Sequence, residues 1–430
     1  MEKDGNHLEC SISDTDIFTP AFVQSDIERC YYEECFPITK LDDNGPVEFV
    51  IENATDKFID LVNTYLKVKL KIVKTNGSDL EATDKVTLTN YPIGSIFSQV
   101  DVNLGGTIVS NSTNTYPYRA YLEALLNFGD DAHNSQLTMG LFTKDSANHM
   151  DETNPGGDNT GLNERNSYSA NVIELCGRLH SDLFSQGRLI VNGVPLKIIL
   201  NRQKDNFMLM SEDNGFKVKL LNVSMVVRKV QLTQHKFTEI QKILETNSAV
   251  YPLNRVTVKT HSVASGLTSL NWDNAFVGQL PNKLFIMMTD NDAFTGVFKK
   301  NPYNFKHFKL SSIGVYVNGE STPSHPMRLN WTTGDYLEAY RSLFLATGKI
   351  NRDEGICISR KEFVNGYVIF GYDLTASNCN GTHQEPRKQG SVRINLEFAE
   401  ALPTTVSIIV YADFDNQIEI DKTRHIIKDF

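Results

Sequence analysis

The residues Thr347-Gly348-Lys349-Ile350 come nearest to a phosphate-binding loop in this sequence. Such a loop cradles phosphates with backbone N–H groups. It needs a second glycine five residues before Gly348, where Leu343 stands, and a hydroxyl after the lysine, where Ile350 stands. We therefore interpret Gly348 as the glycine that ends a helix, because glycine accepts the left-handed backbone conformation common at that position.

Metal-binding patterns are equally incomplete. Asp290-Asn291-Asp292 could begin a calcium loop, but Phe294 stands where a third oxygen ligand is needed, so we predict a turn between a buried strand and a surface segment. None of the six cysteines forms a CxxC pair, the spacing that zinc sites usually use. The sequence therefore predicts no metal site and no cofactor, and it predicts reduced cysteines: Cys10, Cys30, Cys35, Cys176, Cys357 and Cys379.

His180, followed by Ser181 and Asp182, contains the residue types of a Ser–His–Asp triad. Neighbouring residues of a strand point to opposite faces, so these three cannot form a triad among themselves. We interpret His180 as a hydrogen-bonded structural residue. No glycine-rich dinucleotide fingerprint follows a strand, and no ladder of basic and aromatic residues indicates a nucleic-acid reader. The sequence thus predicts neither an enzyme nor a sequence-specific nucleic-acid partner.

The elements that carry these residues are mostly strands. Apolar and polar residues alternate strictly in 66–72, 100–104, 216–220 and 392–398, and Val406, Ile408 and Val410 add a further apolar series of period two. This period of two is typical of antiparallel sheets in which one face meets the core and the other meets water. Turn signals separate the strands, among them Gly105-Gly106, Asn192-Gly193 and Asn318-Gly319. Helical patterns are few and cover about 117–128, 237–245 and 335–347.

A repeat relates the two halves of the chain. Tyr121-Leu122-Glu123-Ala124 recurs as Tyr336-Leu337-Glu338-Ala339, an offset of 215 residues, and Val100, Val102 and Asn103 recur at the same offset as Val315, Val317 and Asn318. The sequence therefore predicts two copies of one β-barrel. We divide the chain into an arm (1–46), a first barrel (47–235), a helical linker (236–249) and a second barrel with a C-terminal tail (250–430).

Residues 129–170 form the longest stretch without a regular pattern, and they are rich in Asn, Asp, Gly and Ser. A loop of this length in a compact domain usually has a function or is disordered. It contains a small apolar group that we predict to dock on a neighbouring chain: Leu137, Met139, Leu141 and Phe142. Deletion of 135–160 would then abolish trimers and leave each barrel folded.

Charge is distributed unevenly. Residues 1–46 contain eleven acidic and three basic side chains, a balance of −8, so the remaining 384 residues carry only −2 of the net −10. An acidic arm has the wrong sign for binding a phosphate backbone. The first residues lack the layout of a secretory signal and no run of 18 apolar residues occurs, so we expect a protein made inside the cell and not secreted.

Many ordered motifs in this chain resemble those of the major capsid proteins of Polinton/Maverick elements and adintoviruses. The resemblance runs from about residue 12 to the C-terminus. It is carried by 45–51, 60–66, 96–102, 114–121, 177–184, 278–281, 290–294, 300–307, 366–367, 373–375, 401–403 and 410–416. It implies an all-β fold, a double jelly roll of two eight-stranded antiparallel barrels with a few short helices. It also implies homotrimeric pseudo-hexameric capsomers in an icosahedral virion shell, with no catalytic residues to carry over.

On this resemblance we expect a structural capsid subunit whose partners are other copies of itself and minor or penton capsid proteins. The alternative is a jelly-roll carbohydrate-binding attachment protein. That function would need exposed aromatic side chains near carboxylates on loops, and Tyr303 and Trp331 are its candidates. The sequence does not indicate whether an internal membrane lies beneath the shell.

Overall fold

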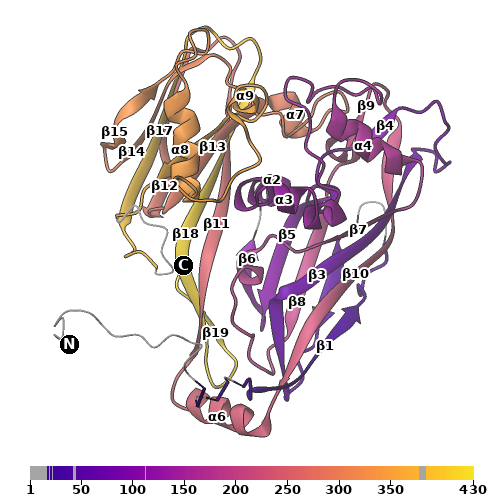
Figure 1. The fold of residues 1–430 in the computed structure, drawn as a ribbon, viewed down its shortest axis with the longest axis vertical. Coiled ribbons are helices and arrows are strands. Elements are labelled where there is room, and N and C mark those ends of the chain that lie inside the picture. Colours follow the sequence, from indigo (N-terminus) through magenta and orange to yellow (C-terminus); the bar gives the residue numbers. More distant parts are fainter. Residues whose placement is uncertain (1–16, 19, 22, 42–44, 112, 377–383) are drawn as a thin grey trace.

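The computed structural model describes all residues of the chain except 1–16, 19, 22, 42–44, 112 and 377–383. Its strands form two upright bodies that stand side by side, one from each half of the chain (Figure 1). All strand pairs in both bodies are antiparallel. Each body consists of two sheets packed face to face around an apolar core.

The first body has one sheet in the order β1-β10-β3-β7 and a second in the order β2-β8-β5-β6. Its strands are β1 (Ile27–Cys35), β2 (Val47–Ile51), β3 (Lys57–Lys74), β5 (Phe97–Leu104), β6 (Thr107–Asn111), β7 (Ile173–Gly177), β8 (Leu196–Arg202) and β10 (Phe216–Leu232). A separate small sheet pairs β4 (Val86–Leu88) with β9 (Leu209–Ser211). Without this small sheet, the eight strands have the two-sheet arrangement of a jelly roll.

The second body repeats this order, with sheets β11-β18-β13-β16 and β12-β17-β14-β15. Its strands are β11 (Ala249–Val263), β12 (Ser269–Gln279), β13 (Lys283–Asp290), β14 (Leu310–Val317), β15 (Glu320–Arg328), β16 (Ile369–Asp373), β17 (Gln389–Phe398) and β18 (Val406–Ile420), and β19 (Ile426–Lys428) pairs with β18. Val100 and Val315 lie on β5 and β14, the corresponding strands of the two rolls. The duplication predicted from the 215-residue offset is therefore confirmed.

Alternation explains why these segments are strands. On β3 the side chains of Leu66, Val68, Leu70 and Ile72 are buried in the core, whereas the intervening lysines face outward. A helix follows the corresponding strands β6 and β15: α2 (Tyr116–Asn127) in the first roll and α8 (Leu337–Thr347) in the second, where it packs along β16. At Gly371, α8 lies so close to β16 that a Cβ atom would be 2.9 Å from the Ser342 carbonyl oxygen.

The predicted arm contains a strand of the first roll. β1 lies within residues 1–46 and pairs with β10 along its length, from Ile27 opposite Leu232 to Cys35 opposite Met225. The first roll therefore begins at Ile27 and not at residue 47. Most side chains of β1 are exposed, because it is an edge strand with little core beneath it. For this reason its sequence shows no apolar alternation.

The stretch 129–170 also differs from the prediction of an irregular loop. It contains α3 (Asp130–His133), the 3-10 turn η2 (Gln136–Gly140) and α4 (Thr160–Ser169). Asn159 caps α4 by accepting a hydrogen bond from the amide of Leu162. The remaining short helical segments are α1 (Pro92–Ser95), η3 (Asp182–Phe184), α5 (Asp205–Met208), α7 (Asn291–Thr295) and α9 (Arg360–Phe363).

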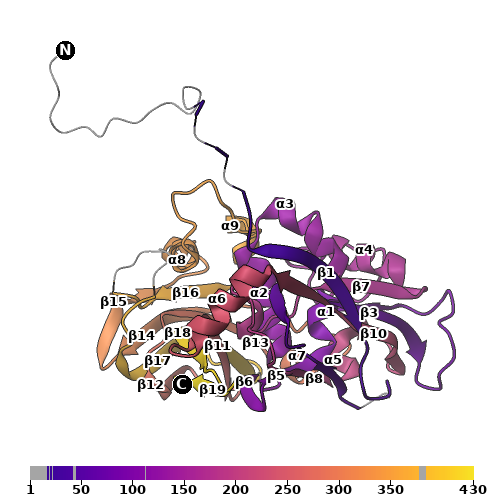
Figure 2. The same cartoon turned by 90° about the horizontal axis from the view of Figure 1, so that it is seen from below.

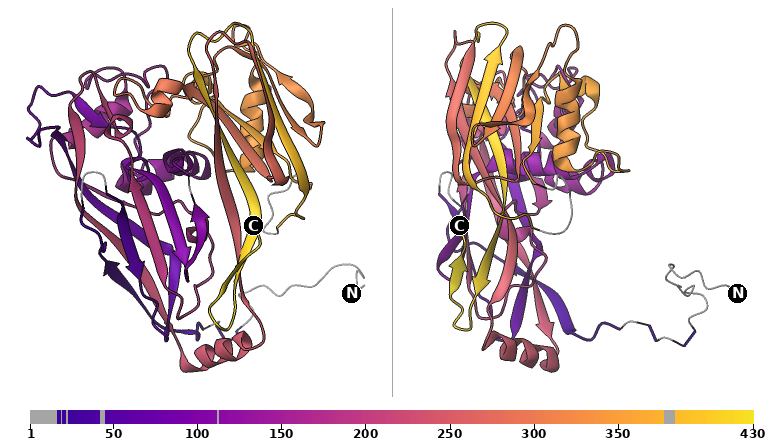
Figure 3. Two further views of the ribbon diagram at one scale, coloured as in Figure 1. Left: turned by 180° about the vertical axis from the view of Figure 1, so that it is seen from behind. Right: turned by 90° about the vertical axis from the view of Figure 1, so that its left-hand side faces the viewer.

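Helix α6 (Gln234–Leu244) connects the two rolls and lies across their lower end (Figure 2). It covers most of the predicted linker, 236–249. The long strands of both rolls run up from this end, and α7 and α9 lie at the other (Figure 1, Figure 3). Within the described residues, no helix has the length and apolar character needed to cross a membrane.

Candidate functional site between the two jelly rolls

Gly348 ends α8 in the left-handed conformation, with φ of 71°, and the amide of Lys349 donates to the carbonyl of Phe344. The interpretation of Gly348 as a helix-ending glycine is confirmed. Lys349 donates from Nζ to the carbonyl of Gly355, which places its ammonium group in a local turn. This segment therefore has the geometry of a helix end.

Asp290 is the last residue of β13, and Asn291 begins α7. The carboxylate of Asp290 pairs with Lys306 at 2.8 Å and with Lys300 at 3.7 Å. Burial alone would raise the pKa of Asp290, but these two lysines lower it below its ordinary value. Among the described residues, no group of three His, Cys, Asp or Glu side chains is placed to hold a metal ion.

His180 is buried and hydrogen-bonded through both ring nitrogens. Nε2 lies 2.9 Å from Tyr91 Oη, and Nδ1 lies 2.8 Å from Glu123 Oε2. Burial lowers the pKa of His180, which favours the neutral ring. Ser181 does not approach this ring in a hydrogen bond, and Asp182 pairs with Arg119 instead. The prediction of a structural histidine is confirmed.

Around His180 lies a cluster of charged groups that joins the two rolls. Arg119 on α2 donates to Glu123 at 2.8 Å and to Asp182 at 2.8 Å, and all three side chains are almost completely buried. From the second roll, the amide of Val256 donates to Asp182 at 3.1 Å, and Tyr411 Oη lies 3.5 Å from Glu123 Oε1. We name Arg119, Glu123, His180, Asp182 and Tyr411 the Arg119 cluster.

The electrostatics of the Arg119 cluster depend on its balance of charges. Burial alone would raise the pKa of Glu123, but Arg119, His180 and Arg178 outweigh it and hold the pKa well below its ordinary value. The pKa of Asp413, which lies opposite Val256 in the pairing of β11 with β18, is raised instead. Burial and the nearby carboxylates of Asp415, Asp182 and Glu123 raise its pKa to about 7, against an attraction from Lys283.

A second cluster is built on Asp145, whose side chain is completely buried. It accepts from Arg165 at 2.6 Å, from Asn159 at 3.0 Å and from Asn301 of the second roll at 2.9 Å. The backbone carbonyl of Asp145 accepts from Tyr367 Oη at 2.6 Å. We name Asp145 and these partners the Asp145 cluster. Both rolls therefore donate hydrogen bonds to Asp145, to its carboxylate and to its backbone carbonyl.

Further contacts continue the junction on either side. Asp151 of the first roll accepts from the amide of Asn301, from Asn304 Nδ2 and from Lys306 Nζ, at 2.8 to 3.0 Å. Lys144 pairs with Glu362 at 2.7 Å. Near α7, Asn206 donates to the carbonyl of Gly296 at 2.6 Å. The predicted loop thus contributes the main bridge to the second roll, through its residues 144–151.

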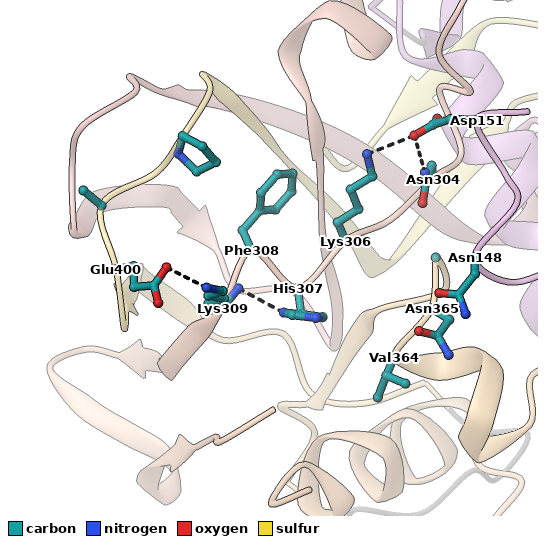
Figure 4. A pocket seen from close by; sticks show the side chains of 13 residues that line it. Asn148, Asp151, Asn304, Lys306, His307, Phe308, Lys309, Val364, Asn365 and Glu400 are labelled. Carbon is teal, nitrogen blue, oxygen red and sulfur yellow. Dashed lines mark hydrogen bonds and ion pairs between the residues drawn. The ribbon is translucent and has the colours of Figure 1, made fainter. Parts of the chain in front are cut away.

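A pocket of about 680 Å³ opens beside this bridge (Figure 4). Its charged side chains are engaged with one another: Lys306 with Asp151 and Asp290, and Lys309 with Glu400 at 2.6 Å. His307 accepts from the amide of Lys309, and burial lowers the pKa of its ring. These pairs within the chain engage the lysine and carboxylate side chains that line the pocket.

The apolar group predicted to dock on a neighbouring chain is largely inside its own chain. Leu141 and Phe142 are buried, and Phe142 packs against Tyr91 and Tyr121 with ring centroids 5.8 and 6.0 Å apart. Of the four residues, Met139 alone is exposed as a large apolar side chain. The docking prediction for this group is therefore wrong, because the segment packs onto its own first roll, against Tyr91 and Ile93.

Neither aromatic candidate for carbohydrate binding has the expected setting. Tyr303 is completely buried and stacks on Tyr121 at 4.0 Å. Trp331 is partly buried, stacks on His307 at 4.3 Å and donates from Nε1 to the carbonyl of Leu310. Tyr303 therefore cannot offer a face to a sugar, and Trp331 is held within a stack of its own chain.

Sequence reasoning did not identify the charged residues of the junction. Arg119 and Glu123 have the i,i+4 spacing that usually marks an exposed helical ion pair. Arg165 lies in a stretch predicted to be irregular. One signal in the sequence could have identified them. Arg119 and Glu123 lie among apolar and aromatic residues from Tyr116 to Leu126, all of which the structure buries.

Comparisons with known proteins agree with this architecture. No family model matches the sequence. A Caenorhabditis elegans protein described as uncharacterized protein F54H12.2 is 26% identical over 405 residues, covering 90% of this chain and 93% of that protein. This relative supports a common ancestry along nearly the whole chain, and its description names no activity.

Solved virus structures have a similar fold. A chain of the Sputnik virophage structure has a TM-score of 0.67 at 14% identity, covering 99% of this chain and 93% of that one. The PBCV-1 capsid gives 0.60 at 11% identity, with 96% and 99% covered. The mavirus major capsid protein gives 0.54 at 12% identity, with 100% and 97% covered. The chain therefore has the double jelly-roll fold that these viral capsids share, and the predicted fold class is confirmed.

Proposed function

We propose that this chain is a major capsid protein, a structural subunit that works by assembling with copies of itself and not by catalysis. The observation that carries the proposal is the fastening of two jelly rolls into one body by the Arg119 and Asp145 clusters. A shell subunit must keep its shape under the contacts of many neighbours. Buried, fully engaged polar groups favour one arrangement of packed elements over others. Similarity to capsid structures along almost the whole chain supports the same role.

The finer assignment is a homotrimer with a pseudo-hexameric outline. Two similar rolls in each chain and three chains in each capsomer give six similar lobes, which can tile a hexagonal lattice and close into an icosahedral shell. Closed rings of identical contacts are the usual outcome when subunits associate by rotation. The body from Ile27 onward carries −5 of the net −10, since residues 1–26 hold six acidic and one basic side chain, and this modest charge limits repulsion between neighbouring copies.

The resemblance of the sequence motifs points further, to the capsid proteins of Polinton/Maverick elements and adintoviruses. On this proposal the protein is assembled inside the host cell and resides in the virion. Its partners are other copies of itself and minor or penton capsid proteins. It has no sequence-specific nucleic-acid site, no metal and no cofactor.

Light scattering and electron microscopy of the purified chain test the proposal. We expect a trimer mass in solution and six-lobed particles or closed shells in the images. A chain that remains monomeric over the whole accessible range of concentration and ionic strength would contradict it. The carbohydrate-binding alternative receives no support from Tyr303, which is buried, so we do not propose it.

A further inference from the structure

An apolar groove lies along α6 at the lower end of the molecule. It has a volume of about 420 Å³. Ten of its thirteen lining residues are apolar or aromatic, and Arg188 is the charged one. Leu232, Ile240, Ile243 and Val250 are among them, and the side chain of Ile243 is 50% exposed. We name this the α6 groove.

The segment before β1 exposes large apolar side chains. Ile17, Phe18 and Val23 are 76%, 89% and 83% exposed. Burial of such side chains against another apolar surface is favourable, because it removes apolar area from water. Their exposure is thus costly unless a surface covers them. We name residues 17–26 the proximal arm.

The proximal arm leaves the molecule at the first turn of α6. The carbonyl of Asp26 accepts from the amide of Thr233 at 2.9 Å, and the carbonyl of Ser25 accepts from Thr233 Oγ1 at 3.3 Å. Lys236 Nζ lies 3.9 Å from the Asp26 carboxylate. The parts of this segment that the structure describes then lead away from the body, and not over α6 (Figure 2).

We propose that Ile17 and Phe18 of one copy insert into the α6 groove of a second copy. The two apolar surfaces lie at the same end of the molecule, and the described residues of a single chain leave both uncovered. Exchange of an identical element between copies covers both surfaces at once and needs no other protein. The inference rests on the proposed function only in requiring that copies assemble.

Charge favours the same pairing. Residues 1–26 contain six acidic side chains and one basic one. The groove presents Arg188, and α6 adds Lys242 in its last turn, whereas Lys236 at its start pairs with Asp26 and Glu239 of its own chain. Acidic residues that flank the inserted apolar pair therefore meet basic residues around the groove. Such complementarity steers association and suppresses wrong pairings.

Photo-cross-linking of the full chain tests the proposal. Phe18 is replaced by p-benzoyl-phenylalanine, and protein grown in ¹⁵N medium is mixed in equal amounts with ¹⁴N protein and allowed to assemble. We expect cross-links from position 18 to residues 232–251, half of them joining a heavy to a light peptide. Cross-links to the groove that join only peptides of the same isotope would show that each arm covers its own groove, which overturns the proposal. Assembled protein with no cross-links to 232–251 overturns it as well.

A pair of groove variants provides the matched control. Ile243→Asp places a charge in the groove, and we expect at least a tenfold loss of these cross-links. Leu267→Asp changes a side chain of similar exposure, 48%, in the turn between β11 and β12, and we expect no loss. Equal loss in both variants contradicts the inference.

Light scattering on the same samples separates the two proposals. Trimers without groove cross-links reject only the arm contact, whereas monomers reject both the arm contact and the proposed function.

Discussion

The backbone amide of Val256 in the second jelly roll donates a hydrogen bond to the carboxylate of Asp182 in the first, at 3.1 Å. The same carboxylate pairs with Arg119 of its own roll at 2.8 Å. One buried side chain therefore depends on both rolls for its partners. A displacement of either roll would leave a buried charge without them, which is costly.

Replacement of Arg119 by methionine should destabilise the protein strongly. Arg119→Met leaves the carboxylates of Glu123 and Asp182 buried without their main counter-charge, and a loss of about 3–5 kcal/mol in the free energy of unfolding follows. Urea denaturation measures it. As a control, Lys309→Met removes an exposed pair with Glu400 and should cost less than about 1 kcal/mol. Similar losses in the two variants would refute a special role for the Arg119 cluster.

Removal of the Asp145 carboxylate should also destabilise the protein strongly. Asp145→Ala leaves Arg165 buried and removes the hydrogen bond from Asn301, so we expect a loss of about 3–5 kcal/mol in the free energy of unfolding. Asp158→Ala, in the same stretch of chain with an 84% exposed side chain, should change it by no more than about 0.5 kcal/mol. Chemical denaturation of both variants decides the matter, and a mild effect at Asp145 would contradict this account of the junction.

Asp413 should make stability depend on pH near neutrality. Its pKa is raised to about 7 in the folded chain from an ordinary 3.8, and its Oδ1 is buried without a hydrogen-bond partner among the described residues. Between these two pH values the folded chain keeps a proton that the unfolded chain has released. The free energy of unfolding therefore falls by up to about 4 kcal/mol as pH rises from about 4 to about 7. Above pH 7 it no longer changes for this reason.

Asp413→Asn removes this penalty, because the amide stays neutral at every pH. We expect the variant to raise the Tm at pH 8 much more than at pH 5, because only part of the penalty has developed at pH 5. Thermal unfolding of the two proteins at both pH values measures the difference. A variant that is destabilised equally at pH 5 and pH 8 would mean that Asp413 is ionised in the folded chain.

Deletion of residues 135–160 gives a different expectation from the one that the sequence alone supports. The deleted stretch contains Phe142, Asp145 and Asp151, which pack or pair within the chain. We now expect loss of the single cooperative unfolding transition, with the second roll melting separately from a damaged first roll. Calorimetry shows whether one transition or two occur. Unchanged cooperative unfolding together with loss of trimers would instead restore the original expectation of a docking loop.

The sequence predicts the strands well where burial is one-sided. Lys67, Lys69 and Lys71 alternate with buried aliphatics on β3, so the period of two is visible in a short window. The sequence does not predict β1, because most of its side chains are exposed on both faces and no apolar alternation results. The junction could not be predicted, because Arg119 and Asp182 lie 63 positions apart and meet only after folding. The chemistry of His180 was predicted correctly, but its partner Glu123 was not.

Helix α6 and the Arg119 and Asp145 clusters connect the same two bodies, but in different ways. A helix alone at one end would act as a hinge, whereas buried ion pairs along the shared face oppose rotation about it. The angle between the lobes is thus a property of the single chain. If copies of the chain assemble as proposed, curvature of the assembly has to arise at the contacts between separate chains.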